Sequence, residues 1–358
     1  MRNRNRQLPG AVVLLALPLA AQYIDPSKLA GNATGAEGKP AFERRITLDV
    51  VVTDRSGKPV SGLGQSDFTV IDDKLPQKLT SFQAFESARA NPPTEVILLL
   101  DRINTPFSLF AQERIEAKKF LERNGGKLEQ PVSLMVLSDT GTVTQPAGRD
   151  GNALAAALDR IDAGLRTVNR SQGIYGAIER LQMSLSWLLS ATDAMGQRPG
   201  RKMMVWISPG WPILSGPGIQ LTSKQQEGLF DDVVNMSTAL RQARVVLYSI
   251  DPIGVADAAS GRTTYYKDFV KGVTRPRGIE PGNLALQVLV EQSGGRVMNS
   301  GNDVAAEIAG CVRDAEAWYA LSFDVPPSDG PDEYHALEVK VAQKGLTART
   351  RQGYYDQP

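Results

Sequence analysis

Residues 94–105 read TEVILLLDRINT, and this stretch decides the fold. Val96–Leu100 is an unbroken apolar run that ends at Asp101. A strand without polar alternation is buried on both faces, which is typical of the centre of a parallel sheet. The stretch therefore predicts the first strand of an α/β domain, with a carboxylate at its carboxyl end.

The residues after Asp101 predict a helix that packs on this strand. Thr105-Pro106 reads as an N-cap followed by proline at the first helical position. We expect the helix to run to about Arg123, with an apolar face made of Phe107, Phe110, Ala111, Ile115 and Phe120. In doubly wound sheets ligands bind outside the carboxyl ends of the strands, so Asp101 is the first candidate for chemistry.

The N-terminus carries the pattern of a secretory signal peptide at residues 1–21. Basic residues precede a short apolar run and a small-residue cleavage site: Arg2, Arg4, Arg6, Ala11–Ala20 and Ala20-Ala21-Gln22. The alternative is a buried N-terminal helix, which Gly10 and Pro18 disfavour. Cleavage near Ala21 predicts a secreted or periplasmic protein without a membrane span, whose residues 22–42 form a flexible lead-in.

Composition is that of a soluble protein with room for two domains: 358 residues, 42% hydrophobic and 22% charged. Without residues 1–21, 37 basic and 39 acidic residues remain. This balance does not indicate a nucleic-acid or anionic-membrane partner. The single cysteine, Cys311, lies in a helical pattern and is expected to be a buried thiol.

Short β patterns flank the α/β pattern. Ile46, Leu48, Val50 and Val52 alternate with polar residues, and Leu337, Val339 and Val341 do the same in the tail. Each end is too small to fold alone. We therefore expect residues 43–90 and 315–356 to form one discontinuous β-sandwich around a Rossmann-like α/β domain at 94–314, whose mostly parallel sheet is doubly wound.

Within the α/β domain the remaining elements follow from apolar runs and helical spacing. The expected strands are Val132–Leu137, a short edge strand at Gly141–Val143, Met203–Ile207 and Val245–Ile250. The expected helices are Ala153–Ile161, Ile174–Leu188, Leu284–Gln292 and Asp303–Arg313, with a further helix after a capping box of Ser223 and Gln226. The polar stretch 252–282 has no apolar period and is expected to be functional or mobile.

Four stretches resemble von Willebrand factor A-type domains, and more closely the bacterial VWFA-related proteins first grouped from acidobacteria. They are VVVTDRSGKPVSGLGQSDFTVIDD (50–73), VILLLDRINTPF (96–107), GIYGAIERL (173–181) and YHALEVKVAQKGLTARTRQGYY (334–355). The resemblance implies a secreted or periplasmic A-domain held in a β module. It also implies binding of macromolecules, often through a metal at the carboxyl edge of the sheet.

The metal motif of that family, Asp-x-Ser-x-Ser, is altered in this chain. Asp101 and Thr105 keep a carboxylate and a hydroxyl, but Ile103 replaces the first hydroxyl. Gln172 matches the position of the family's threonine ligand, and Pro209 matches that of its second aspartate. Mg²⁺ needs a nearly octahedral shell of oxygens, so we expect no cofactor, or at most weak binding of Mg²⁺ or another divalent cation.

The two motif residues that remain do not by themselves require a metal. Thr105 is accounted for as a helix cap, and Asp101 can be held by backbone N–H groups at a helix N-terminus. Asp139 and Asp251 also end strands and could form an alternative cation site with Asp101. The only histidine, His335, lies in a tail strand, and catalytic motifs such as HExxH or Gly-x-Ser-x-Gly are missing from the sequence, so we do not expect an enzyme.

A protein partner would need buried aromatic and arginine contacts. The candidates at the carboxyl edge are Asn104, Trp211, Arg262, Tyr265 and Tyr266. The alternative is that Trp211 folds back over the sheet edge. Three functions remain open: a metal-free binding domain of adhesion or scaffold type, an envelope-assembly protein that binds through its β module, and a metal-dependent adhesion domain with a rebuilt site.

Overall fold

The computed structural model describes residues 44–86, 94–161, 173–212, 220–254, 264–299, 301–325, 330 and 332–356. The signal and lead-in segments expected at 1–42 lie outside these ranges, as do Gln172 and Arg262. Within the ranges, no helix combines the length and the apolar character needed to cross a membrane.

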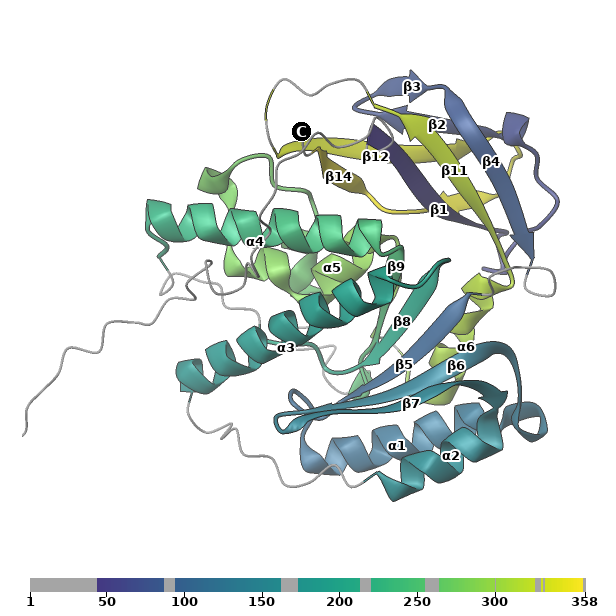
Figure 1. The fold of residues 1–358 in the computed structure, drawn as a ribbon, viewed down its shortest axis with the longest axis vertical. Coiled ribbons are helices and arrows are strands. Elements are labelled where there is room, and N and C mark those ends of the chain that lie inside the picture. The colour runs from purple at the N-terminus through teal and green to yellow at the C-terminus, as the bar shows by residue number, and fades with distance from the viewer. Residues whose placement is uncertain are drawn as a thin grey trace, which may run out of the picture. The chain divides into compact units, whose positions relative to one another are not determined.

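A six-stranded sheet forms the centre of the α/β domain (Figure 1). Its strands are β5 (Glu95–Asp101), β6 (Lys127–Ser138), β7 (Gly141–Asp150), β8 (Lys202–Ile207), β9 (Val245–Ile250) and β10 (Val297–Met298). The order is β10-β9-β8-β5-β6-β7, with every neighbouring pair parallel except β6 and β7. This confirms the expected doubly wound, mostly parallel sheet.

Helices cover both faces of that sheet (Figure 1). They are α1 (Phe107–Leu121), α2 (Gly151–Arg160), α3 (Gly173–Gly196), α4 (Ser223–Gln242), α5 (Leu286–Ser293) and α6 (Val304–Val312). Leu98 and Leu100 of β5 pack in one core with α1, α2 and α6. Ile97 and Leu99 pack in a second core with α3, α4 and α5. The apolar run is therefore buried on both faces, as its lack of alternation predicts.

Local details both confirm and correct the expected elements. Cys311 is fully buried on α6, and burial raises the pKa of its thiol to about 12. The edge strand β7 is ten residues long, which is longer than the expected Gly141–Val143. Its residues are mostly exposed, so no apolar pattern in the sequence marks the length over which they pair with β6. The capping box of α4 is formed by Thr222 and Gln225, one residue earlier than expected, because Thr222 is the residue with extended backbone.

The part of 252–282 that the structure describes is packed. It contains the 3₁₀ helices η7 (Tyr265–Phe269), η8 (Pro276–Gly278) and η9 (Pro281–Leu284). Tyr266 and Phe269 of η7 form a small core with Ala285 and Val288. Other short 3₁₀ helices are η3 (Gln65–Asp67), η4 (Arg123–Gly126) and η10 (Arg313–Ala315).

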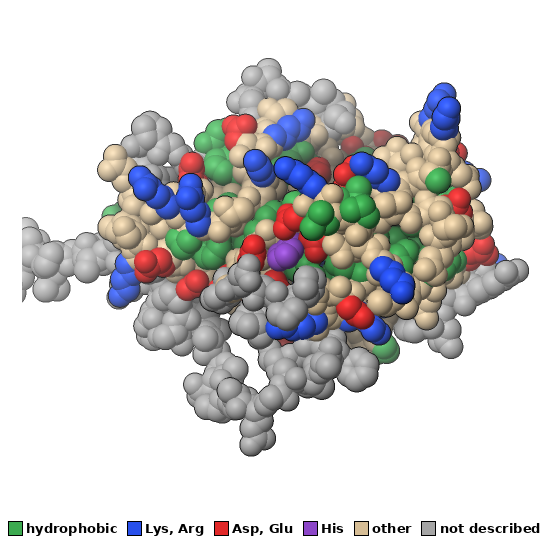
Figure 2. Space-filling model, turned by 90° about the horizontal axis from the view of Figure 1, so that it is seen from above, with side chains coloured by type: hydrophobic (Ala, Val, Ile, Leu, Met, Phe, Trp, Pro, Cys, Tyr) green, Lys and Arg blue, Asp and Glu red, His purple; other side chains and the backbone are tan. Residues whose placement is uncertain are grey.

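The two ends of the chain share two four-stranded sheets. The strands are β1 (Arg45–Thr53), β2 (Phe68–Asp72), β3 (Leu75–Gln77), β4 (Leu79–Glu86), β11 (Ala317–Asp324), β12 (Glu333–Val341), β13 (Thr347–Arg349) and β14 (Gly353–Asp356). The orders are β13-β1-β11-β4 and β14-β12-β2-β3, so each sheet contains strands from both ends. One core, which includes Leu48, Phe68 and Phe323, lies between them. The surface seen from this end carries the single histidine among acidic side chains (Figure 2).

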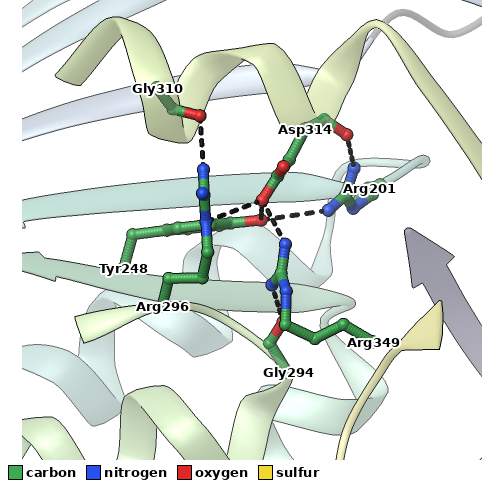
Figure 3. A network of polar contacts seen from close by, with 7 residues as sticks. All are labelled: Arg201, Tyr248, Gly294, Arg296, Gly310, Asp314 and Arg349. Carbon is green, nitrogen blue, oxygen red and sulfur yellow. Dashed lines mark hydrogen bonds and ion pairs between the residues drawn. The ribbon is translucent and has the colours of Figure 1, made fainter. Parts of the chain in front are cut away.

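A buried carboxylate joins the sandwich to the α/β domain (Figure 3). Asp314 of η10 is 1% exposed, and its Oδ2 accepts a hydrogen bond from the Tyr248 hydroxyl at 2.9 Å. The same oxygen pairs with Arg296, at 3.4 Å, and with Arg349 of β13. The backbone carbonyl of Asp314 accepts from Arg201 Nη1 at 2.9 Å. A strand of the sandwich is thus tied by charge to the amino-terminal edge of the α/β sheet.

Candidate functional site

The candidate site lies where the strand order of the α/β sheet reverses. From β5 the chain continues outward to β6 and β7, and it returns on the other side of β5 to form β8. Ligands of doubly wound sheets bind outside the carboxyl ends of the strands at such a point. Asp101 is the last residue of β5, and Ser208 directly follows β8. These two residues therefore mark the site.

Protein donors saturate the Asp101 carboxylate, which is fully buried. Its Oδ1 accepts from the backbone N–H groups of Ile103, at 2.9 Å, and Asn104, at 3.0 Å. Its Oδ2 accepts from Asn104 Nδ2 at 2.8 Å, Trp206 Nε1 at 3.1 Å and Ser208 Oγ at 2.9 Å. A carboxylate offers about four lone-pair sites, so a cation would have to displace donors that already fill them.

The side chains of Ile103 and Asn104, in the loop after β5, point into the domain, which explains why protein donors surround Asp101. Ile103, at the position where the resemblance implies a hydroxyl ligand, is 1% exposed and packs in the core shared with α3 and α4. Asn104 is 3% exposed, and its amide bridges Asp101 to Ser184 of α3, with an Nδ2–Oγ distance of 2.9 Å. Both amide hydrogens of Asn104 are used inside the domain, and its contact with a partner stays a prediction.

Thr105 does not cap the helix, contrary to the sequence interpretation. Helix α1 starts at Phe107 with Pro106 in the N-cap position, and no side chain caps it. The Thr105 side chain instead lies beside the carboxyl group of Glu113, one of the buried residues of α1. Burial raises the pKa of Glu113 well above its ordinary value, and the negative charges of Asp101 and Asp251 raise it further. Glu113 therefore stays neutral over a wider pH range than an exposed glutamate.

The alternative cation site expected from Asp101, Asp139 and Asp251 is not assembled. Asp251 is 4% exposed and uses its Oδ1 to accept from the backbone N–H of Ile253 at 3.0 Å, within its own turn. Asp139 is half-buried in the turn between β6 and β7. Among the described residues, the group of potential metal ligands that converges within 4.8 Å lies elsewhere, in the sandwich.

The aromatic residues expected to bind a partner are mostly buried. Trp211 is 3% exposed, packs edge-on against Trp206 and donates its Nε1–H to the carbonyl of Leu284 at 2.8 Å. It folds back over the sheet edge, which is the alternative that its sequence position left open. Tyr266 is 6% exposed because it anchors η7 on α5. Tyr265 is 40% exposed and packs edge-on against Phe269, and Arg262 lies outside the described residues.

Other aromatic residues are exposed at the same edge. Phe107, the first residue of α1, is 69% exposed, and Tyr175, in the first turn of α3, is 67% exposed. The Arg102 guanidinium carbon lies 5.4 Å from the ring centroids of both Phe107 and Phe110. Because Asn104 contacts Ser184, the part of α3 before Ser184, about 16 Å of helix, extends past the loop (Figure 1).

Several residues of the site could not be predicted from the sequence, each for a reason that can be identified. Trp206 lies inside an apolar strand, a position that predicts a core residue, and no sequence signal reveals where its ring N–H points. Ser208 follows β8 next to Pro209, so its position at a strand end is a usable signal. Glu113 belongs to the buried face of α1, whereas the expected apolar face includes Phe107, Ala111 and Ile115, which are exposed.

No protein-family model and no curated protein matches this chain. Similar solved structures include an aerotolerance-related membrane protein from Bacteroides fragilis NCTC 9343, with 12% identity, coverage of 62% of this chain and 98% of that chain, and a TM-score of 0.33. The pilus adhesin SpaC from Lactobacillus rhamnosus GG is 10% identical, over 82% of this chain and 43% of its own, with a TM-score of 0.37. The VWA domain of SpRpn10 is 13% identical, over 44% and 75%, with a TM-score of 0.24.

The α/β domain has the doubly wound, mostly parallel sheet that the sequence predicts. It has the sheet with one antiparallel edge strand and the two helix layers described above. At these identities and TM-scores the likenesses carry no argument about ligand, partner or process.

Proposed function

We propose that this chain is a secreted or periplasmic protein-binding domain, of adhesion or scaffold type, that contacts its partner at the carboxyl edge of the α/β sheet without a metal ion. The saturation of Asp101 carries the proposal. Five donors from the protein occupy the carboxylate that would otherwise be the centre of a cation site. Affinity at this edge must then come from side chains, and binding rather than catalysis fits that arrangement.

Exposed aromatic side chains supply such affinity. Trp, Tyr and Arg are enriched among the residues that dominate binding energy, and large exposed apolar side chains mark interaction surfaces. Phe107 and Tyr175 stand at the starts of two helices whose N-termini face the same edge, and Tyr265 adds a third aromatic ring. We define Phe107, Tyr175 and Tyr265 as the edge aromatics.

A second candidate function places the contact on the β-sandwich. Leu75 is 66% exposed and belongs to β3, which ends its sheet. An exposed apolar residue on an edge strand is a recognised point of strand-to-strand association. An envelope-assembly role through this strand is the alternative that Leu75 supports.

Alanine variants of these residues separate the two functions. Phe107→Ala and Tyr175→Ala should each weaken partner binding by about 1–3 kcal/mol. Because both side chains are exposed, the free energy of unfolding should change by no more than about 0.5 kcal/mol. Leu75→Ala is the matched control and should leave binding unchanged. Quantitative pull-down from an envelope extract, followed by titration of the captured protein, provides the measurement.

The opposite result would overturn the proposal. If Leu75→Ala weakens binding while Phe107→Ala and Tyr175→Ala do not, the partner binds the sandwich. If binding requires Mg²⁺ and is lost in Asp101→Ala with the fold intact, the third function, a metal-dependent adhesion domain, is the correct one.

A further inference from the structure

A cluster of metal-ligating side chains lies in the β-sandwich, outside the site described above. Asp72 ends β2, Asp73 follows it, and His335 lies on the neighbouring strand β12. One ligand atom from each residue lies within 4.8 Å of the other two. From these residues we propose a binding site for a divalent first-row transition metal ion, with Zn²⁺ as the probe.

The two distances from His335 Nδ1 to the carboxylate oxygens fit ligands of a single ion. His335 Nδ1 lies 3.1 Å from Asp72 Oδ1 and 3.3 Å from Asp73 Oδ2. Two ligands that are each about 2.1 Å from one zinc ion are separated by such distances when the angle between them is about 95–105°. These angles lie between octahedral and tetrahedral geometry, which are both common for transition metals in proteins.

Each ligand is oriented by a group that is not itself a ligand. The Tyr354 hydroxyl donates to Asp72 Oδ2 at 2.8 Å, which leaves Oδ1 facing His335. The backbone N–H of Ala336 donates to Asp73 Oδ1 at 2.9 Å, which leaves Oδ2 facing the same nitrogen. The His335 ring stacks on the ring of Tyr354, with centroids 4.8 Å apart and an interplanar angle of 14°. Hydrogen bonds of this kind to ligating carboxylates are typical of metal sites.

The backbone also fixes the two carboxylates relative to each other. Asp73 and Lys74 have φ angles of 45° and 71°, the left-handed values that a tight turn between β2 and β3 requires. This turn places Asp73 beyond the end of β2, beside the strand that carries His335. Asp72 is almost fully buried, whereas the Asp73 side chain is 48% exposed. The site therefore opens to solvent on the side of Asp73 and leaves coordination positions for water.

The donor set decides which class of ion fits. Imidazole nitrogen suits zinc, copper, iron and nickel, whereas magnesium and calcium prefer oxygen ligands alone. One imidazole with two carboxylates therefore favours a transition metal ion over the hard cations.

Calorimetry on the purified, tag-free full chain tests the site, because a polyhistidine tag would compete for the ion. Titration with ZnCl₂ should show one saturable site per chain, and titration with MgCl₂ should show at least tenfold weaker binding. Asp73→Asn and His335→Gln should each weaken Zn²⁺ binding at least tenfold. Tyr354→Phe should weaken it by about 10–100-fold, the usual effect of losing an orienting partner.

The controls separate loss of ligand from loss of fold. Glu338→Gln removes an exposed carboxylate on the same strand, one that pairs with Lys340 at 3.5 Å, and should leave Zn²⁺ binding unchanged. Asparagine tolerates left-handed backbone, so Asp73→Asn keeps the turn, and far-ultraviolet circular dichroism checks this. Zn²⁺ binding that Asp73→Asn and His335→Gln leave unchanged would overturn the proposal, and so would the absence of saturable binding.

The single histidine offers an independent readout. Its imidazole gives one set of ¹⁵N signals, because the chain has no other histidine. Saturation with Zn²⁺ should shift the Nδ1 resonance of His335 to a metal-bound position, with the proton on Nε2. A Nδ1 resonance that does not move at saturation would show that the ion binds elsewhere and would overturn the assignment.

Discussion

Two aspartates, Asp101 and Asp314, are buried at opposite edges of the same sheet and are stabilised in different ways. Asp101 lies at the carboxyl edge, and all five of its hydrogen bonds come from neutral N–H and O–H donors of its own domain. Asp314 lies at the amino-terminal edge and pairs with Arg296 and Arg349, of which Arg349 belongs to the sandwich.

The difference shows how a buried charge can serve two purposes. At the carboxyl edge, neutral donors hold the Asp101 carboxylate, so its charge is not available to a cation. Arg349, which belongs to the sandwich, makes the second carboxylate an attachment point between the sandwich and the α/β domain. The first arrangement therefore removes a cation site, and the second couples the sandwich to the α/β domain.

The largest effect is expected from removing the carboxylate that couples the two parts. Asp314→Ala leaves Arg296 and Arg349 without their carboxylate partner and the Tyr248 hydroxyl without its acceptor, and it should cost about 3–4 kcal/mol of unfolding free energy, since breaking a buried pair typically costs about 3–5 kcal/mol. Asp159→Ala, which removes a half-exposed partner of Lys118, is the control and should cost at most about 1 kcal/mol. Guanidinium unfolding measures both. Equal costs would show that the buried pair does not couple the two parts.

A smaller loss is expected at the carboxyl edge. Asp101→Asn replaces one acceptor oxygen with an NH₂ group that faces donors, and we expect a cost of about 2–3 kcal/mol because each unsatisfied buried group costs about 1–3 kcal/mol. Asp303→Asn is the matched control. Asp303 accepts one bond, from Ala306 N at 2.9 Å, and asparagine caps a helix as well as aspartate does. If the two variants lose the same stability in guanidinium unfolding, donor saturation does not explain the state of Asp101.

Glu113 adds a pH dependence to that edge. The unfolded chain releases this proton near the ordinary pKa of 4.5, and the folded protein releases it at higher pH because burial raises the pKa. Between these values the folded state binds more protons, so stability falls as pH rises through that window. Glu113→Gln should remove this loss and stabilise the protein at pH 8, because the amide stays neutral where the buried carboxyl group would have to ionise.

Thermal unfolding at pH 5 and pH 8 measures the Glu113 effect. The gain in Glu113→Gln should be smaller at pH 5 than at pH 8. Glu122→Gln, at an exposed position just after α1, should show no such pH dependence. A gain that is the same at both pH values would mean that packing, and not titration, causes it.

The smallest effect concerns magnesium. If the Asp101 donors exclude a cation, the dissociation constant is no tighter than about 1 mM, and 1 mM Mg²⁺ stabilises the protein by at most about 0.4 kcal/mol. The melting temperature should then rise by less than about 2 °C. A larger rise that Asp101→Asn abolishes and Asp73→Asn preserves would show that the carboxyl edge still binds a cation.

The sequence by itself determined the architecture, because hydrophobic pattern dictates burial. The apolar run Val96–Leu100 could only be buried on both faces, and it lies at the centre of the parallel sheet. The alternating segments at the two ends were each too small to fold alone, and they share both sheets of the sandwich. The altered residues after Asp101 were also visible in the sequence.

Tertiary structure alone decided what the side chains at the two sites do. The ring N–H of Trp206 reaches Asp101 only because β8 lies next to β5, and no local pattern reports that direction. The burial of Trp211 and Tyr266 depends on how a loop without apolar periodicity packs. Asp72 and His335 are 263 residues apart in the chain, and only the pairing of β2 with β12 brings them together. Periodicity specifies which face of an element is buried, but hydrogen bonds between distant side chains depend on three-dimensional neighbours.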